Sequence, residues 1–588
     1  MTGAELIAQW LRTHGVTHLF GLPGSQNAVL YNALRREERQ AGSQAWISTH
    51  EMSAGFTALG YAAARGAPAV LSIIGGPGFS YALTPLLEAA SDSLPLVCLV
   101  FVRRERPGKR FQGQAIDHLA LGSAAAKAVL TMTHSEADSS SPLAVLDRAW
   151  HLAQTGQPGP VVVLAEAEFL ESDVGPPESF GSEPLMSAAA AEGPPTVDLV
   201  VDRLLHELAA PGRKLFWLGR GTLGAADTFQ LLAERYDAVV ITTTSARGVM
   251  AEDHPRCLPH DLVPADVVNP FLAEFDHIFA WGVRMSENAC KGFELRLPRE
   301  KLIHLDAEPM ALDGNYPARF TACVDVAEIA RRLIDSPAGR NQHGRSSSLS
   351  GMAGGEALVS WRARFASSHA SRLEPRVPGV TPPTPAGFFR ALREVLPDEA
   401  ILVLDSGFHQ LLARRYFCVR RPRGLLLPAN FQSMGFAIGA ATGAKLACPD
   451  RHVVALLGDG GFRMSGLELL AAVERRISLV TVIFDDGYYG LIRNRQIFVD
   501  GQTHGVALPP ICYGSFAQAI GANFVDGSSA PAEAIGEALA SELPTIVAVR
   551  LNDTPAYRIA QYKARARFRL GQMAGPQLLR WLRRRLRP

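Results

Sequence analysis

Short apolar runs separated by amphipathic stretches recur along the chain from its first residues to about residue 550. Runs such as Ala69–Ile74, Lys214–Leu218 and Ser478–Phe484 are rich in Val, Ile, Leu and Phe, as buried parallel strands are. Stretches such as Ala4–His14 and Met52–Ala64 instead place apolar residues at helical spacing. Strands and helices that alternate in this way predict parallel sheets with helices on both faces.

Two stretches rich in Pro, Ser, Ala and Gly interrupt this alternation, and we expect them to be linkers. The prediction is therefore an α/β protein of three consecutive doubly wound parallel-sheet domains, followed by a basic amphipathic helical tail. The expected boundaries are 1–170 for the first domain, 171–196 for a linker, 197–335 for the central domain, 336–375 for a second linker, 376–556 for the third domain and 557–588 for the tail.

The strongest chemical signal follows two apolar runs in the last third of the chain. Asp459 lies in the turn after His452–Leu457, and Asp486 lies in the turn after Ser478–Phe484. Helical spacing over Leu467–Arg475 separates the two runs. Because ligands bind at the carboxyl ends of strands in an open parallel sheet, both carboxylates are expected at the ligand edge. Mg²⁺ takes one or two carboxylates together with phosphate oxygens and water, so the pair predicts a magnesium–phosphate site. A plain acidic turn is the alternative.

Composition and charge exclude several classes of protein. Of the 588 residues, 47% are hydrophobic and 20% are charged, as in an ordinary soluble globular protein. The formal net charge of +1 argues against nucleic-acid binding. The seven cysteines are scattered without CxxC spacing, so we expect free thiols in a reducing compartment. No secretory signal or membrane-spanning run is recognisable, and a cytoplasmic location is the expectation.

Asp486 follows Asp459 by 27 residues, and this spacing within GDGGF and DDGYYG resembles the fingerprint of thiamine diphosphate-dependent enzymes. The resemblance implies that Asp459, Asp486 and the main-chain carbonyl of Tyr488 hold Mg²⁺. Many members have Asn-Asn where this chain has Asp-Asp. The segments DSGFH and NFQSMGFAIGAATGAKLACPDRHVVALLGDGGF are similar to the same family. They imply that Met434 bends the cofactor and that the carbonyl of Gln432 accepts a hydrogen bond from its amino group. The other residues implied to contact the cofactor are Ser406, Gly407, Phe408, His409, Gly458, Gly460 and Gly461.

Glu51 is a lone carboxylate at the start of a predicted helix, where the helix dipole alone would favour it. However, FGLPGSQNAVLYNAL, THEMSAGFTALGYAAARG and GGPGFSYALTPLLEAASDSLPLV resemble the pyrimidine-binding domain of the acetolactate synthase branch. In that branch a glutamate at this position bonds the pyrimidine ring and promotes loss of the thiazolium proton. Gln112 and Ser25 are candidates for groups near the reacting carbonyl, and a solvated loop glutamine is the alternative for Gln112. Pyruvate decarboxylases carry a His-His pair in this region, and this chain has none there.

The middle of the chain, from GRGTLGAADTF onward, is similar to the central domain of the same family, which binds flavin in some relatives. Arg284 and Asp306 lie where flavin-binding members place an arginine and an acidic residue. The glycine-histidine loop of those members is not recognisable around Cys257–Val268. FAD therefore stays open as a cofactor but is not favoured, whereas thiamine diphosphate and Mg²⁺ are expected.

The resemblance implies a carboligase that decarboxylates a 2-oxo acid, with pyruvate as the expected donor, and joins the acyl carbanion to an acceptor carbonyl. A decarboxylase, lyase or flavin oxidase on the same fold is the alternative, and a non-catalytic scaffold is disfavoured by the intact Glu51 and Asp459. In the family these two residues meet across a dimer interface, so a homodimer at minimum, or a homotetramer, is expected. Arg495 suggests a substrate with an extra anionic group and a specialised pathway. A solvent-facing arginine is the alternative there.

The chain from Ala556 onward holds ten basic residues and no acidic one. Four leucines fall on one helical face among arginines, with Trp581 beside them. Such a tail could contact an anionic membrane surface, or it could cover another subunit of the oligomer.

Overall fold

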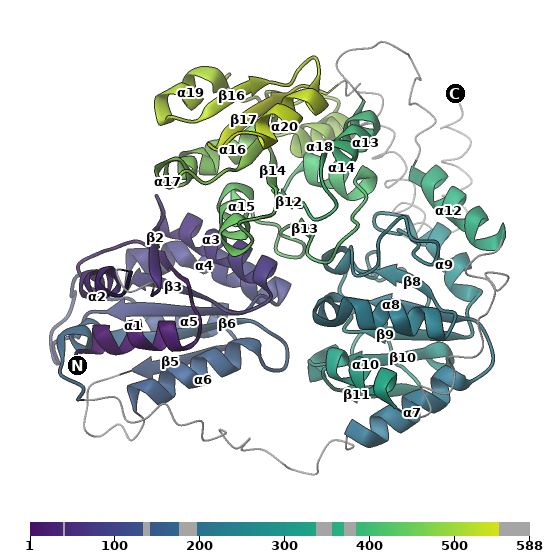
Figure 1. Cartoon of the computed structure of the whole chain (residues 1–588), viewed down its shortest axis with the longest axis horizontal. Coiled ribbons are helices and arrows are strands. Elements are labelled where there is room, and N and C mark those ends of the chain that lie inside the picture. The colour runs from purple at the N-terminus through teal and green to yellow at the C-terminus, as the bar shows by residue number, and fades with distance from the viewer. Residues whose placement is uncertain (39–41, 133–140, 176–196, 337–355, 370–383, 552–588) are drawn as a thin grey trace.

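The computed structural model describes residues 1–38, 42–132, 141–175, 197–336, 356–369 and 384–551. These residues form three α/β domains, each built on one parallel sheet, so the predicted fold class is confirmed. In Figure 1 the N-terminal domain lies at the left, the central domain at the right and the C-terminal domain above them. The predicted tail, 557–588, lies outside the described residues, as do most of the two predicted linkers. Within the described ranges, no helix has both the length and the apolar character needed to cross a bilayer.

The N-terminal domain has six strands in the order β2-β1-β3-β4-β6-β5. In β3, Val70 packs in an apolar cluster with α1, α2 and α6, whereas Leu71 packs in the cluster that contains α3 and α4. Helices therefore cover both faces of the sheet, as strands that are apolar throughout predict. The elements are α1 Gly3–Thr13, β1 His18–Gly21, α2 Ala28–Glu38, β2 Gln44–Ile47, α3 Glu51–Arg65, β3 Ala69–Ile74, α4 Pro77–Asp92, β4 Leu96–Val102, α5 His118–Ala125, β5 Ala128–Met132, α6 Pro142–Gln154 and β6 Pro160–Glu166.

The central domain has five strands in the order β11-β10-β9-β7-β8. Helix α12 lies inside the linker that the sequence predicted over 336–375, and its Leu358, Trp361 and Phe365 pack with α9 and β9. These three apolar residues form a short helical stripe that the composition of the surrounding stretch concealed, and α12 belongs to the central core. The elements are α7 Val197–Ala209, β7 Lys214–Leu218, α8 Ala226–Arg235, β8 Val239–Thr242, α9 Ala265–Ala273, β9 His277–Trp281, β10 Leu302–Asp306, β11 Phe320–Cys323, α10 Val326–Asp335 and α12 Glu356–His369.

The C-terminal domain has six strands in the order β13-β12-β14-β15-β17-β16. A helix begins directly at Asp459, eight residues before the helix that the sequence predicted at Leu467–Arg475, because the glycines after Asp459 conceal the helical pattern. The elements are α13 Pro385–Val395, β12 Ile401–Leu404, α14 Phe408–Tyr416, β13 Leu425–Leu426, α15 Phe436–Ala447, β14 Val453–Gly458, α16 Asp459–Ser465, α17 Leu469–Glu474, β15 Val480–Phe484, α18 Gly490–Asp500, α19 Tyr513–Ile520, β16 Asn523–Asp526, α20 Pro531–Leu539 and β17 Thr545–Val549.

Helices α3 and α15 join the N-terminal and C-terminal domains where their backbones come close together (Figure 1). A Cβ added to Gly443 would lie 1.8 Å from the carbonyl oxygen of Thr57, and one added to Gly60 would lie 1.9 Å from that of Ala440. Only glycine allows this approach. Helix α3 begins with Glu51 and α15 follows Met434, so the contact fixes two segments that carry predicted cofactor contacts.

Candidate active site

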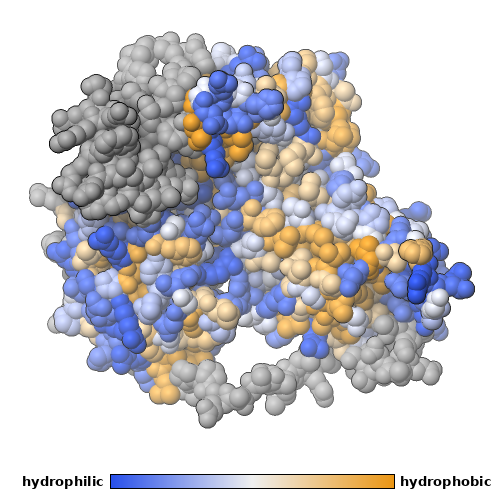
Figure 2. Space-filling model, turned by 180° about the vertical axis from the view of Figure 1, so that it is seen from behind, coloured by the Kyte–Doolittle hydropathy of each residue, from blue (hydrophilic) through white to orange (hydrophobic). Residues whose placement is uncertain are grey.

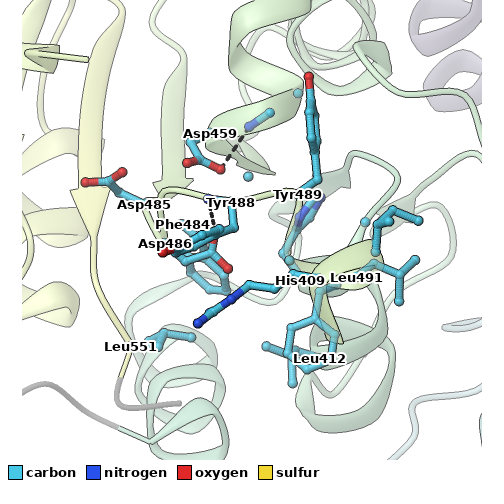
Figure 3. Close-up of a pocket in the computed structure, with 18 of the residues that line it drawn as sticks. His409, Leu412, Asp459, Phe484, Asp485, Asp486, Tyr488, Tyr489, Leu491 and Leu551 are labelled. Atoms are coloured by element: carbon cyan, nitrogen blue, oxygen red, sulfur yellow. Dashed lines mark hydrogen bonds between the residues drawn. The ribbon is translucent and has the colours of Figure 1, made fainter. Parts of the chain in front are cut away.

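A cavity of about 370 Å³ lies at the carboxyl ends of β12, β14, β15 and β17, which are adjacent strands of the C-terminal sheet. Its position and size are those of a small-molecule site in an open α/β sheet. The side chains of His409, Asp459 and Asp486 surround it (Figure 3). Of the residues predicted to contact the cofactor, the lining includes Ser406, Gly407, Phe408, His409, Met434, Gly458, Asp459, Gly460, Gly461, Asp486 and Tyr488.

Two of the three predicted metal ligands, the carboxylates of Asp459 and Asp486, lie in this cavity at the ends of neighbouring strands. Asp459 is buried, and its Oδ2 accepts the N–H of Gly487 at 2.9 Å, while Oδ1 of Asp486 accepts the N–H of Tyr488 at 3.0 Å. Burial, and then the charge of Asp486, raise the pKa of Asp459 to about 6. A divalent cation would stabilise the ionised form of Asp459, which burial and the neighbouring carboxylate disfavour.

The described residues contain no group of three or more His, Cys, Asp or Glu side chains that could hold a metal ion. A cation here would therefore need oxygens beyond the two carboxylates, and Mg²⁺ usually takes them from phosphate and water. The backbone beside Tyr488 is held on both sides, because Gly487 accepts the N–H of Leu508 at 2.9 Å and Tyr489 donates to Val506 at 2.9 Å. The site thus fits Mg²⁺ together with a diphosphate. The role of the Tyr488 carbonyl stays a prediction.

Gly460 lies where the cavity wall leaves no space for a side chain. A Cβ at this position would lie 2.7 Å from the ring of Tyr489 and 3.6 Å from Cε of Met434. Met434 is half-buried and lines the cavity, as a wedge against the cofactor would require. Gln432 has a φ of +64° and an exposed side chain, and it is not part of the lining, so its carbonyl contact stays a prediction.

Asp405 begins the DSGFH segment that the sequence comparison with the family pointed to, but it was given no role of its own there. Its buried carboxylate accepts backbone N–H groups from Ser406 at 2.7 Å, Gly435 at 3.0 Å and Ala437 at 3.2 Å. Burial raises the pKa of Asp405 to about 7. The side chain therefore ties the turn at 406–409 to the start of α15. A polar residue directly after a strand as apolar as β12 was the signal that could have indicated this buried anchoring role.

His409 is held by the same turn. Its Nε2 lies 2.9 Å from the carbonyl oxygen of Asp405, and since a carbonyl only accepts, Nε2 carries the proton. Burial lowers the pKa of His409 to about 4, so the imidazole is neutral at neutral pH. The ring packs against the glycines at 407 and 458 on the wall of the cavity.

Glu51 lies outside this cavity. It is the first residue of α3, after His50, whose Nδ1 accepts the N–H of Met52 at 3.1 Å and caps the helix. The Oε1 of Glu51 lies close to the start of α4, 3.3 Å from the position that a Cβ on Gly78 would occupy. The structure therefore places Glu51 at the ligand edge of the N-terminal sheet, separate from the acidic pair of the C-terminal sheet.

A second cavity of about 220 Å³ lies at the carboxyl ends of β3, β4 and β6 of the N-terminal sheet. Gln112 lines it, and its amide holds its own loop by accepting the N–H of Arg106 at 2.8 Å and donating to the carbonyl of Arg106 at 3.1 Å. Ser25 is exposed and does not line the cavity, whereas its buried neighbour Gln26 does. Gln26 donates to the Oε1 of Gln114 at 2.6 Å.

The arginines of the predicted substrate and flavin sites lie in different surroundings. Arg495 is exposed on α18 and outside the cavity, whereas Arg493 lines the cavity with its guanidinium carbon 4.0 Å from the centre of the Tyr488 ring. In the central domain, Arg284 donates to the carbonyl of Ser91, and Asp306 accepts the N–H of Glu308. Both flavin candidates are thus engaged in contacts within the protein, and nothing in the described site favours FAD.

Three family models match successive parts of the chain. They describe the N-terminal TPP binding domain of thiamine pyrophosphate enzymes at residues 1–121, the central domain at 201–333 and the C-terminal TPP binding domain at 405–549. They correspond to the three sheets of the fold.

The chain is 26% identical over 496 residues to the acetolactate synthase isozyme 1 large subunit of Escherichia coli, covering 84% of this chain and 83% of that protein. It is 27% identical over 511 residues to the acetolactate synthase large subunit of Parasynechococcus marenigrum, covering 84% and 78%. The solved structure of a thiamine diphosphate-dependent 4-hydroxybenzoylformate decarboxylase from Rhodococcus jostii superposes with a TM-score of 0.76 at 22% identity, over 94% of this chain and all of that chain, and supports the fold. With all three domains matched in order, this chain belongs to the thiamine diphosphate-dependent enzymes of the acetolactate synthase and decarboxylase superfamily.

Proposed function

We propose that the protein is a Mg²⁺-dependent carboligase that removes CO₂ from a 2-oxo acid, with pyruvate as the first donor to test. It joins the remaining acyl group to an acceptor carbonyl, as an acetolactate synthase does. The observation that carries the proposal is the cavity at the acidic pair Asp459 and Asp486, whose position and donors suit a diphosphate held through Mg²⁺. The similarity to acetolactate synthase large subunits over most of the chain supports the reaction class.

Each part of the chain has a separate role in this proposal. Asp459 and Asp486 would hold Mg²⁺, and the turn at 406–409, fixed by Asp405, would contact the diphosphate. Met434 would press against the middle of the cofactor, and Glu51 would exchange a proton with its pyrimidine ring. Bound thiamine diphosphate supplies a carbon nucleophile and an electron sink for decarboxylation.

The N-terminal cavity favours ligation over release of an aldehyde. Among the described residues that line it, His118 is the one imidazole, and its Nε2 accepts the N–H of Gly76 at 2.9 Å. Burial lowers the pKa of His118, so the ring is neutral and its Nε2 carries no proton to give. Without a proton on this imidazole nitrogen, His118 cannot protonate an acyl carbanion through Nε2, and attack on a second carbonyl competes better.

A homodimer would complete the site, because the cavity around Asp459 is lined by C-terminal residues and not by Glu51. Hydrophobic residues gather on the N-terminal domain at the right of Figure 2 and on the C-terminal domain at its upper right. A second copy would cover exposed apolar side chains of both domains and bring its own Glu51 to this cavity. These side chains are Ile47, Tyr81, Phe111 and Leu119 in the N-terminal domain and Phe431, Met464, Leu467 and Leu470 in the C-terminal domain.

Mass spectrometry of reaction products tests the proposal. Purified protein would receive thiamine diphosphate, Mg²⁺ and pyruvate, with and without a panel of oxo acids and aldehydes, beside a Glu51→Gln variant as the matched control. A product with a new carbon–carbon bond that is absent with Glu51→Gln is the expected result. Aldehyde as the sole product would contradict the carboligase and favour a decarboxylase, and no turnover of pyruvate would point to another donor.

Subunit mixing tests whether the site is shared between two chains. It requires a known donor substrate but not the identity of the acceptor. Glu51→Gln and Asp459→Asn chains should each be inactive alone. After mixing and reassociation, half of the dimers contain both chains, and each of these holds one site with both native residues, so about a quarter of the wild-type activity should return. No recovery, despite mixed dimers detected by native mass spectrometry, would exclude a site shared in this way.

A further inference from the structure

A buried carboxylate of the C-terminal domain holds the segment that leads to Glu51. Glu468 lies at the end of the short turn after α16, and its side chain is fully buried. Its Oε2 accepts the backbone N–H of Thr49 at 3.0 Å and the hydroxyl of Thr49 at 2.8 Å. Thr49 is followed by His50, the helix cap, and then by Glu51. The position of Glu51 is therefore set from the opposite domain, two residues before it.

A buried carboxylate pair of the N-terminal domain holds the segment that leads to Met434. Oε2 of Glu88, in α4, accepts the backbone N–H of Ser433 at 3.1 Å. Asp92, one turn further along α4, accepts the N–H groups of Ala429 at 2.7 Å and Asn430 at 3.2 Å and the side-chain amide of Asn430 at 2.6 Å. Since Asp405 holds the N–H of Gly435 on the other side, the backbone of Met434 is fixed on both sides by buried carboxylates.

The two arrangements are reciprocal. In each, a fully buried glutamate of one domain accepts a backbone N–H just before a predicted cofactor contact of the other domain. Burial raises the pKa of both carboxyls, Glu88 and Glu468, so holding them inside is unfavourable unless these bonds form. Helix α4 lies beside both segments, because its first turn is next to Glu51 and its last two turns hold 429–433.

We propose that Glu88 and Glu468 are positioning residues that set Met434 and Glu51, respectively, across the interface between the N-terminal and C-terminal domains. The inference rests on the proposed function for the meaning of Met434 and Glu51. In the proposed dimer, Met434 and Glu51 of one chain serve different active sites. The hydrogen bonds made by Glu88 and Glu468 would therefore also connect the two sites mechanically. Neither glutamate touches the cofactor cavity.

Amide hydrogen exchange of the cofactor-free protein tests the links directly. Glu468→Leu should raise exchange about tenfold in peptides covering 46–52, and Glu88→Leu should do so in peptides covering 429–436, each leaving the other segment unchanged. Glu468→Gln and Glu88→Gln keep an acceptor oxygen and should restore protection. Glu207→Gln, a buried and ion-paired carboxylate of the central domain, is the matched control and should change neither segment.

Cofactor measurements separate positioning from general stability. Glu88→Leu should weaken binding of thiamine diphosphate about tenfold, because Met434 shapes its cavity. Glu468→Leu should leave that affinity within about twofold but slow deuterium exchange at the cofactor's C2 position about tenfold, because this step depends on the placement of Glu51. If Glu468→Leu does not fold, Thr49→Val removes one of the same bonds from an exposed side chain and should slow C2 exchange about threefold.

Two results would overturn the inference. One is unchanged amide exchange in both segments for both Leu variants. The other is an equal rise in exchange throughout the chain, which would show that the glutamates only stabilise the fold. Wild-type protein that does not bind thiamine diphosphate would instead contradict the proposed function, and the amide-exchange result on cofactor-free protein would still decide whether the links exist.

Discussion

Replacing Gly60 with alanine should separate the two helices that join the N-terminal and C-terminal domains. A Cβ at Gly60 would lie 1.9 Å from the carbonyl oxygen of Ala440 and 2.4 Å from its Cα. Ordinary contacts between such atoms begin near 3.4 Å, so α3 and α15 would have to move apart by about 1.5 Å. The atoms that must yield are backbone atoms of a packed helix, and no change of rotamer can relieve the contact.

The cost follows from two opposing effects. Overpacking of a well-packed interface costs up to about 3 kcal/mol. Alanine in a helix interior is favoured over glycine by about 1 kcal/mol. The expected net loss of stability is therefore about 2 kcal/mol. The edge-on contact of Phe56 and Phe436, with ring centres 5.4 Å apart, lies in the same interface and would weaken as the helices separate.

Chemical denaturation monitored by circular dichroism measures this effect, with the midpoint of the first unfolding transition as the readout because a three-domain chain need not unfold in one step. Gly536→Ala in α20 is the matched control. Its new Cβ would meet Val395 Cγ1 at 3.8 Å, an ordinary contact, so this variant should be about 0.5–1 kcal/mol more stable than the wild type. A Gly60→Ala protein that unfolds at the wild-type midpoint or above it would refute the close approach of α3 and α15.

Three further predictions concern the site. Chelation of divalent metal, or Asp459→Asn, should weaken binding of thiamine diphosphate at least about tenfold in equilibrium dialysis, and unchanged affinity would exclude a metal bridge at this carboxylate. Arg493→Ala should raise a substrate KM about tenfold while Arg495→Ala leaves every KM unchanged, and the reverse result would restore Arg495 as the substrate contact. Because burial raises the pKa of Glu88, the folded protein holds a proton that the unfolded chain releases above about pH 4.5. The contribution of protonated Glu88 to stability is thus present at low pH and lost as pH rises through the pKa of Glu88 in the folded protein. The Tm of Glu88→Gln minus that of the wild type should therefore increase from pH 5 to pH 9. Parallel Tm profiles of the two proteins would contradict this.

Within each domain, the pattern of the sequence predicted strands better than helices, because α12 and the helix that begins at Asp459 were both missed. The strands Ala69–Ile74 and Lys214–Leu218 have the bounds that their apolar runs predict. A strand buried on both faces can be recognised from its own short run of apolar residues. The rule that ligands bind at the carboxyl ends of strands requires only the order of elements within one sheet. For this reason Asp459 and Asp486, which lie on adjacent strands of one sheet, could be placed in one cavity without the structure.

The contacts that could not be predicted depend on how elements rotate and dock. Glu468 and Thr49 are 419 residues apart, and Glu88 and Ser433 are 345 apart, so no local periodicity relates either pair. Arg495 shows the same limit on a smaller scale. Each residue of an α-helix is rotated by about 100° from the one before it. The side chains of Arg493 and Arg495, two residues apart on α18, therefore point in directions that differ by about 200°. The family resemblance pointed to Arg495 as the substrate contact, whereas in the structure Arg493 lines the cavity and Arg495 is exposed, because of the rotation of α18. The side chains that position Met434 and Glu51 therefore lie at the interface between the domains, where spacing in the sequence does not predict which residues are in contact.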